Sequence, residues 1–267
     1  MEKIKKYCYL DTNVINKMMK SEELKSEIMN LDCELIISKQ TLLNTSISKE
    51  DYTNLISFLR EIDVNTVIEF NELLKCEERA FKCDSIITDI EYVAFNINDL
   101  WDMLNVFIYN EDFITKKRIK LVNIRKNLYK NLLKVNPNYK YNKDESIKVN
   151  ADNFVMMATN NAIRINQVDF YNEYILPIIE NNLDPNMRCL RKFKSWKMML
   201  YLLYYKYKSN IKLLNDLDIE DISMSSCYPY MDYIIVDGDK LDDIKNNHDI
   251  LEGRRVYKVV NGKLLEI

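Results

Sequence analysis

Three aspartates stand where strands are expected to end or a helix to begin. Asp11 follows the β-prone run 6–10, Asp237 follows the β-prone run 233–236, and Asp221 lies in an acidic stretch where we expect a short helix to begin. Ligands and catalytic groups collect at the carboxyl ends of strands in open parallel sheets. Carboxylates that converge there repel one another, and a hard divalent cation with oxygen ligands relieves this repulsion. The sequence therefore predicts a Mg²⁺ or Mn²⁺ site formed by Asp11, Asp221 and Asp237.

The composition narrows the chemistry that such a site can serve. The chain of 267 residues has one histidine and three glycines. It cannot assemble a two-histidine ribonuclease site, a multi-histidine zinc site or a glycine-rich phosphate loop. A carboxylate-held cation needs none of these, because it lowers the pKa of a bound water, positions it for attack and offsets transition-state charge. Hydrolysis of phosphodiester bonds is the reaction that this leaves open.

Each aspartate also has an ordinary structural explanation. Asp and Thr are preferred N-cap residues, so Asp11 or Thr12 can simply begin a helix. Asp221 can stabilise a helix N-terminus through its negative charge, and Asp237 precedes Gly238 in what reads as a turn. A calcium-binding EF-hand is excluded because the acidic stretch lacks the glycine and the distal glutamate that its loop requires.

The elements that must position these residues differ between the ends of the chain and its middle. Short buried strands are expected at 6–10, 34–37 and 233–236, and Asn261-Gly262 between two β-prone runs predicts a hairpin. From Asp51 to Lys208 apolar residues recur at helical spacing without a glycine. We therefore expect one α/β domain, residues 1–267, whose core comes from 1–50 and 213–267 and whose residues 51–212 form an all-helical insert.

Charge is distributed unevenly along the sequence. The net charge is −3, yet the stretches 113–149 and 186–212 carry +9 and +8. Solvated helix faces are the ordinary explanation. The second stretch, however, interleaves its basic residues with aromatic ones: Phe193, Trp196, Tyr201, Tyr204, Tyr205 and Tyr207. Basic groups neutralise phosphates and aromatic rings stack on unpaired bases. The pattern is compatible with a nucleic-acid partner, although aromatic residues at helical spacing are also typical of a core.

The remaining features indicate the compartment. The six cysteines contain no C-x-x-C pair, and no apolar run approaches the roughly 20 residues of a membrane span. We expect a reduced, cytoplasmic protein without a membrane partner; a homo-oligomer is left open. His248 is expected in an exposed loop.

The order of the acidic motifs resembles the PIN-domain nucleases. The resemblance covers roughly 1–50 and 213–260 and depends on four motifs: the strand running into Asp11-Thr12-Asn13, Asp221 opening a helix, the segment Tyr228-Pro229-Tyr230-Met231-Asp232, and the strand ending at Asp237. It implies a PIN-like three-layer fold with a central parallel sheet. It also implies that Asp11, Asp221 and Asp237 hold one or two Mg²⁺ or Mn²⁺ ions and cleave RNA, with Asp232 as an auxiliary acid and Thr12 supporting Asp11 or the ligand by hydrogen bonding.

One position departs from the family pattern. The family usually has a glutamate in the helix after the second strand, and here Asn44 occupies that position. An amide oxygen can coordinate a cation but brings no charge, so metal affinity should be lower. The departure favours an alternative, a catalytically impaired PIN-like module that binds RNA or protein.

A haloacid-dehalogenase-type phosphatase is the other alternative. Asp11 would be its nucleophile, and Gly238-Asp239 to Asp243 resembles its metal motif. Asn13, however, stands where that chemistry needs an acid/base aspartate, and an amide cannot transfer the proton.

Overall fold

The computed structural model of the chain describes most of its residues. The described residues are 5–38, 41–42, 49–68, 70–83, 93–97, 115–116, 119–120, 122–123, 126, 129, 144–164, 188–209, 216–238 and 240–267. Asn44 and Asp239 lie outside them.

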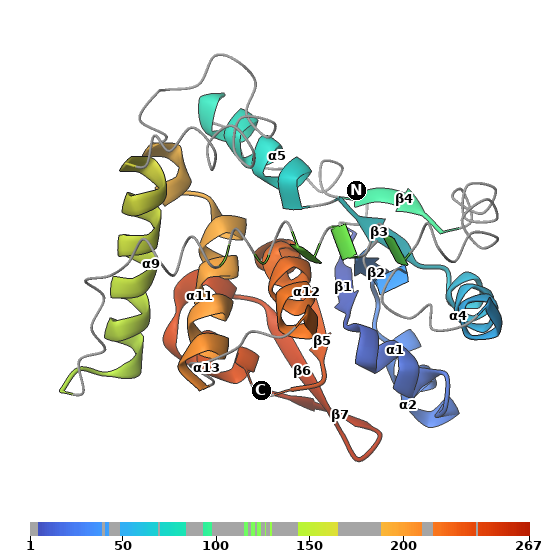
Figure 1. Cartoon of the computed structure of the whole chain (residues 1–267). Coiled ribbons are helices and arrows are strands. Elements are labelled where there is room, and N and C mark those ends of the chain that lie inside the picture. The colour runs from blue at the N-terminus through green and yellow to red at the C-terminus, as the bar shows by residue number, and fades with distance from the viewer. Residues whose placement is uncertain are drawn as a thin grey trace.

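A single sheet organises the described part of the chain (Figure 1). Its seven strands lie in the order β4-β3-β2-β1-β5-β6-β7. The inner five strands, from β3 to β6, are parallel, and β4 and β7 pair antiparallel at the two edges. The strands are β1 (Tyr7–Leu10), β2 (Glu34–Ser38), β3 (Asn65–Val67), β4 (Val93–Asn96), β5 (Tyr233–Val236), β6 (Arg255–Val260) and β7 (Lys263–Glu266). The strand order therefore reverses between β1 and β5.

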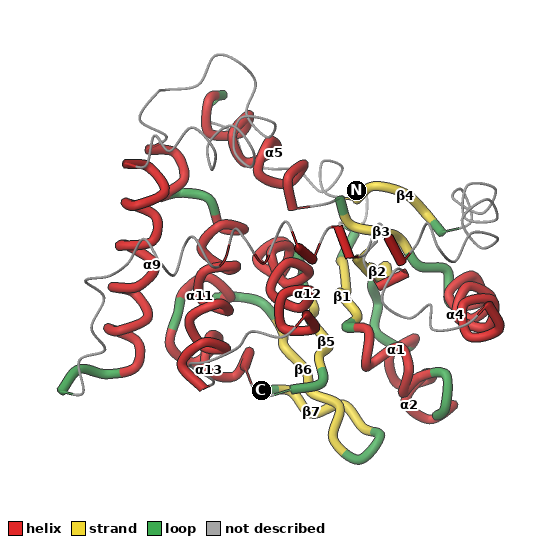
Figure 2. The backbone as a smooth tube through the Cα atoms, viewed as in Figure 1, coloured by secondary structure: helices red, strands yellow, loops and turns green. Residues whose placement is uncertain are grey.

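Helices cover both faces of this sheet (Figure 2). They are α1 (Thr12–Met18), α2 (Glu22–Met29), α4 (Lys49–Glu61), α5 (Phe70–Lys82), α9 (Ile147–Arg164), α11 (Lys194–Ser209), α12 (Asp216–Met224) and α13 (Lys240–Asn247). Short 3-10 helices lie at η2 (Arg188–Arg191), η3 (Ser225–Tyr230) and η4 (Asp249–Leu251).

Alternation along the strands divides the core into two clusters. Tyr7 and Tyr9 of β1 lie in one cluster together with buried side chains of α5, α9, α11, α12 and α13. Cys8 and Leu10 lie in the other, with side chains of α1, α2 and α4. Every residue of β1 and β5 is buried, as expected for strands covered on both faces. The chain thus forms an α/β fold of three layers around a mostly parallel sheet, which confirms the expected fold class at that level.

The end strands agree with the sequence. The runs at 6–10, 34–37 and 233–236 form β1, β2 and β5, and Asn261-Gly262 joins β6 and β7. Asn261 and Gly262 have φ of 51° and 78°, the positive values that a type I′ hairpin turn needs at both positions. The predicted strands and hairpin are confirmed.

The expectation that 51–212 is all-helical is wrong in two places. β3 and β4 fall within it and extend the sheet beyond β2. They have three and four residues, too few for periodicity to distinguish a strand from the end of a helix. In addition, α11 belongs to the main core, where Met199 and Leu203 are fully buried. A core restricted to 1–50 and 213–267 is therefore too narrow.

Among the described residues, no helix combines the length and apolar character that crossing a bilayer requires.

Candidate functional site

Two of the three predicted acids follow neighbouring parallel strands. Asp11 comes directly after β1 and Asp237 directly after β5. Leu10 and Ile235 are partners in the register, and the Asp11 N–H donates a hydrogen bond to the Ile235 carbonyl at 3.1 Å. Both carboxylates are therefore held at the C-terminal ends of β1 and β5. The strand order reverses between these two strands, and ligand sites of open α/β sheets form at such positions.

Asp11 also begins a helix, as its structural explanation predicted. It is the N-cap of α1, and its Oδ1 accepts a hydrogen bond from the Thr12 N–H at 2.8 Å. Thr12 thus supports Asp11 through its backbone, whereas its hydroxyl donates to the Thr41 hydroxyl at 3.3 Å. Thr41 is fully buried and was not among the predicted site residues. Thr41 lies in the segment after β2, three residues before Asn44. The family resemblance already points to this segment, and that was the signal from which Thr41 could have been found.

Asp221 reaches the site from a different position than expected. It lies in the interior of α12, which begins at Asp216, so the prediction that Asp221 opens a helix is wrong. The acidic run 216–221 explains the difference, because negative residues are favoured throughout the first turn of a helix. Asp218 and Asp221 are three residues apart and hence share one face of α12.

The three carboxylates are close enough to affect one another. The pKa of Asp11 is raised to about 6, chiefly because the side chain is buried, then because of the charge of Asp221, and to a smaller extent that of Asp237. Backbone groups of Thr12 and Asp237 partly offset the rise. Asp11 after β1, Asp221 in α12 and Asp237 after β5 are thus near enough for their charges to act on Asp11. A carboxyl group with a pKa near 6 can take up and release a proton close to neutral pH.

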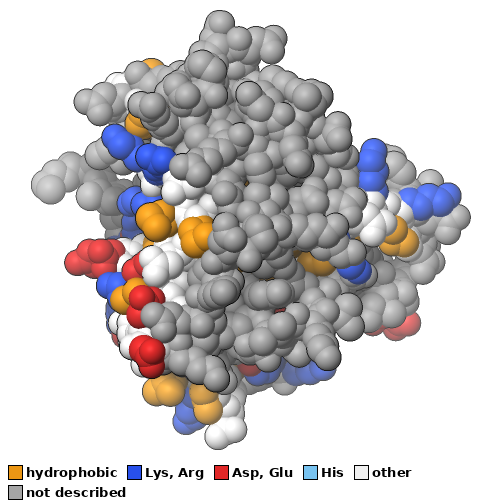
Figure 3. All heavy atoms as spheres, turned by 60° about the vertical axis from the view of Figure 1, so that its left-hand side comes forward, with side chains coloured by type: hydrophobic (Ala, Val, Ile, Leu, Met, Phe, Trp, Pro, Cys, Tyr) orange, Lys and Arg blue, Asp and Glu red, His pale blue; other side chains and the backbone are white. Residues whose placement is uncertain are grey.

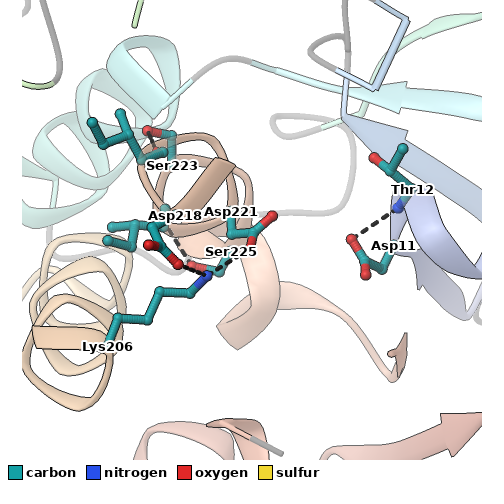
Figure 4. A network of polar contacts seen from close by, with 9 residues as sticks. Asp11, Thr12, Lys206, Asp218, Asp221, Ser223 and Ser225 are labelled. Atoms are coloured by element: carbon teal, nitrogen blue, oxygen red, sulfur yellow. Dashed lines mark hydrogen bonds and ion pairs between the residues drawn. The ribbon is translucent and has the colours of Figure 1, made fainter. Parts of the chain in front are cut away.

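Two lysines pair with the other acids of the cluster. Lys206 of α11 approaches Asp221 at 2.6 Å and Asp218 at 3.0 Å, and Figure 4 shows it reaching both carboxylates from one side while Asp11 and Thr12 face them from the other. Lys17 of α1 pairs with Asp237 at 2.9 Å. Converging carboxylates require positive charge nearby, which was a signal that some cation would approach them. Nothing in one sequence identified which lysines would do so.

Asp232 does not join the cluster. It lies at the start of β5, where it accepts a hydrogen bond from the Tyr7 N–H at 2.9 Å and faces Arg254 at 3.7 Å. Asp237 is five residues further along the chain, about 16 Å at the rise of an extended strand. The assignment of Asp232 as an auxiliary acid of the site is therefore not supported, since Asp232 lies at the N-terminal end of β5 and the acidic cluster lies at its C-terminal end.

Four of the six aromatic residues of the second basic stretch are buried and therefore cannot stack on bases. Phe193, Trp196, Tyr204 and Tyr205 are buried in the core, and Tyr201 is partly buried against it. The side chain of Tyr207 lies outside the described part of the chain. The core explanation is confirmed for the four buried rings.

As they stand, no three His, Cys, Asp or Glu side chains of the described part form a group that could hold a metal ion. The acids of the cluster converge, but Asp221 and Asp237 are turned to lysines. A divalent cation would have to compete with these lysines for the carboxylates of Asp221 and Asp237.

Comparison of the chain with protein-family models, with curated proteins and with solved structures found no match.

Proposed function

We propose that the chain is a divalent-cation-dependent ribonuclease of PIN-like organisation that works through Asp11, Asp221 and Asp237. The observation that carries this proposal is the convergence of the three acids at the point where the strand order reverses. Its clearest sign is the pKa of Asp11, which burial and the charges of Asp221 and Asp237 raise to about 6. Stored repulsion of this kind is what a bound cation relieves.

The donor set fits Mg²⁺ or Mn²⁺, which prefer carboxylate oxygens. Such an ion would supply a water of lowered pKa and would offset charge on the phosphate. The chain's own residues would do the rest. Asp11 would bind the ion as a charged carboxylate, because a cation beside it lowers the pKa that is raised in the metal-free site. Lys206, once Asp221 turns to the ion, is left beside the site and can contact a phosphate oxygen.

A binding function without catalysis is the second candidate, and one observation favours it. Lys206 and Lys17 already provide positive charge to Asp221 and Asp237. A site that carries its own cations can be stable without metal. The phosphatase alternative gains no comparable support, because Asn13 is exposed on α1 and Asp239 lies outside the described residues.

Cleavage assays separate these functions. End-labelled single-stranded RNA and DNA of one sequence are incubated with the protein in Mg²⁺, in Mn²⁺ and in EDTA. We expect metal-dependent cleavage of RNA by the wild type, and its loss in Asp11→Asn and in Asp237→Asn. Asp232→Asn, at the other end of β5, is the matched control and should retain cleavage.

Three results would overturn the proposal. Cleavage that is absent with every metal, while RNA still binds, supports the binding module. Cleavage that survives both substitutions would come from another site or a contaminant. A phosphate trapped covalently on Asp11 would indicate the phosphatase.

A further inference from the structure

A second site lies on the side of the molecule where α9 packs against α11. A pocket of about 590 Å³ opens between α9, the start of α11 and the turn from α13 into η4. This volume is in the range of small-molecule sites. Five basic residues line it: Lys148, Arg191, Lys192, Lys194 and Lys197.

Helical spacing brings these groups to one place. Lys148 and Asp152 lie one turn apart on α9, and Val155, Met156 and Thr159 continue the same face. On α11, Lys194, Lys197 and Tyr201 likewise share a face. Figure 3 shows this side of the molecule, where basic side chains gather next to exposed hydrophobic ones. Met156 is among the exposed hydrophobic residues.

The positive charge of the pocket is not balanced within the described part of the chain. No described carboxylate forms an ion pair with any of the five cations; Arg191 donates instead to the neutral Asn160 side chain at 2.8 Å. The pocket contains two acids, Asp152 and Asp249. Asp152 is engaged elsewhere, because it accepts a hydrogen bond from the Tyr201 hydroxyl at 2.8 Å and lies 3.1 Å from His248 Nδ1.

His248 forms the floor of the pocket and adds no charge to it. The expectation of an exposed loop is wrong, since His248 is 6% exposed and its ring stacks on Tyr201 at 3.9 Å. Burial lowers the pKa of His248, and Asp152 only partly offsets this. The neutral ring can donate from Nδ1 to Asp152 and accept at Nε2 from Tyr205, 2.9 Å away. Asp152, Tyr201 and His248 thus line the pocket as one hydrogen-bonded network, which Tyr205 supports through His248.

We propose that this pocket binds the phosphate of a nucleotide, either a free nucleotide or the phosphorylated end of an RNA strand. Several cations that no described carboxylate pairs with favour a ligand with more than one negative charge, and a guanidinium such as that of Arg191 suits phosphate geometry. Val155, Met156 and Ile250 provide an apolar wall for the sugar or base.

The pocket is separate from the acidic cluster. Lys197 and Lys206 are nine residues apart on α11, which is about 14 Å along the axis and half a turn around it. The two lysines thus serve opposite faces of the helix. The proposal does not depend on nuclease activity, and binding can be measured in EDTA and on the Asp11→Asn background.

The test is calorimetric titration in EDTA at low and moderate salt. The ligands are a nucleoside, its 5′-monophosphate and 5′-triphosphate, and one short RNA with either a 5′-phosphate or a 5′-hydroxyl. The variant Lys194→Gln/Lys197→Gln removes two pocket cations. Lys20→Gln/Lys263→Gln removes two exposed lysines outside the pocket and is the matched control.

We expect the phosphorylated ligands to bind, and the pocket variant to weaken binding about tenfold or more while the control stays close to wild type. Asp249→Asn removes one of the two pocket acids and should tighten binding, a gain that misfolding cannot produce. Binding of the free nucleotides identifies a nucleotide site, and binding of 5′-phosphorylated RNA alone identifies a strand-end site. Equal affinity for both RNAs without nucleotide binding, no binding of any ligand, or affinity that the pocket variant leaves unchanged would overturn the proposal.

Discussion

The charge of Asp11 should destabilise the folded protein at neutral pH. A substitution that removes this charge should therefore raise the free energy of unfolding. The variant is Asp11→Asn. Asn is about as good an N-cap as Asp, so the cap on α1 is retained and only the charge is lost. The partly buried carboxylate and its repulsion with Asp221 and Asp237 are the features under test.

The size and sign of the effect follow from the pKa of Asp11. Folding raises it from 3.8 to about 6, a shift of about 2 units, which corresponds to about 3 kcal/mol as an upper value. Between these two pKa values the folded state binds more protons than the unfolded state, so the free energy of unfolding falls as the pH rises. Above about pH 6 the full cost is present, and below about pH 4 it is absent. Asp11→Asn should therefore be more stable than wild type by up to about 3 kcal/mol at pH 7.5 and nearly equal to it at pH 4.

Urea unfolding in EDTA measures this difference. Tryptophan fluorescence reports the loss of the core, because Trp196, one of the two tryptophans, is 2% exposed. Wild type and variant are compared at several pH values from 4 to 7.5. Glu252→Gln, at an exposed position directly after η4, is the control and should change stability by less than about 0.5 kcal/mol.

Two outcomes would contradict the prediction that the charge of Asp11 destabilises the folded state. If Asp11→Asn is less stable than wild type at pH 7.5, the surroundings of Asp11 stabilise its charged carboxylate instead of destabilising it. If the difference between the two proteins does not change with pH, the pKa of Asp11 is not raised in the folded state.

The remaining predictions concern the lysine partner of the cluster, a buried acid and the hairpin turn. Lys206→Gln frees its carboxylate partners, so Mn²⁺ measured by titration should bind more tightly than to wild type; weaker binding would mean that the lysine supports the site. Glu77 is buried and accepts hydrogen bonds from the Ser195 N–H and hydroxyl and from the Tyr230 hydroxyl. Glu77→Ala leaves these donors without their acceptor and should lower the free energy of unfolding by about 3 kcal/mol in urea titrations, with Glu77→Gln intermediate; equal losses in both would contradict this role. Gly262 has φ of 78°, so Gly262→Ala should lower stability by about 1 kcal/mol in thermal unfolding, and an unchanged midpoint would show that the turn relaxes.

The sequence predicts those features of the fold that local patterns determine. Continuous apolar runs mark β1 and β5 because both of their faces are covered. Asn261-Gly262 marks the hairpin because its turn needs positive φ. That Asp11 and Asp237 each follow a strand could be predicted in the same way, whereas the pairing of β1 with β5 that brings them together could not.

Features that depend on distant contacts could not be predicted in this way. β3 is only three residues long and is defined by its pairing with β2 and β4. Asp232 was assigned to the site by motif order, although the start of a strand lies a full strand length from its end. The pairing of Lys206 with Asp221 depends on how α11 packs beside α12, and the burial of His248 depends on α9 and α11. A single sequence has no pattern that reports such contacts.

The most direct test of the metal site is a crystal of the protein soaked in Mn²⁺ and measured for anomalous scattering. We predict a peak between Asp11, Asp221 and Asp237, with Lys206 and Lys17 turned away from their carboxylates. A well-ordered site with no peak at that position, and with both lysines still paired to Asp221 and Asp237, would contradict it.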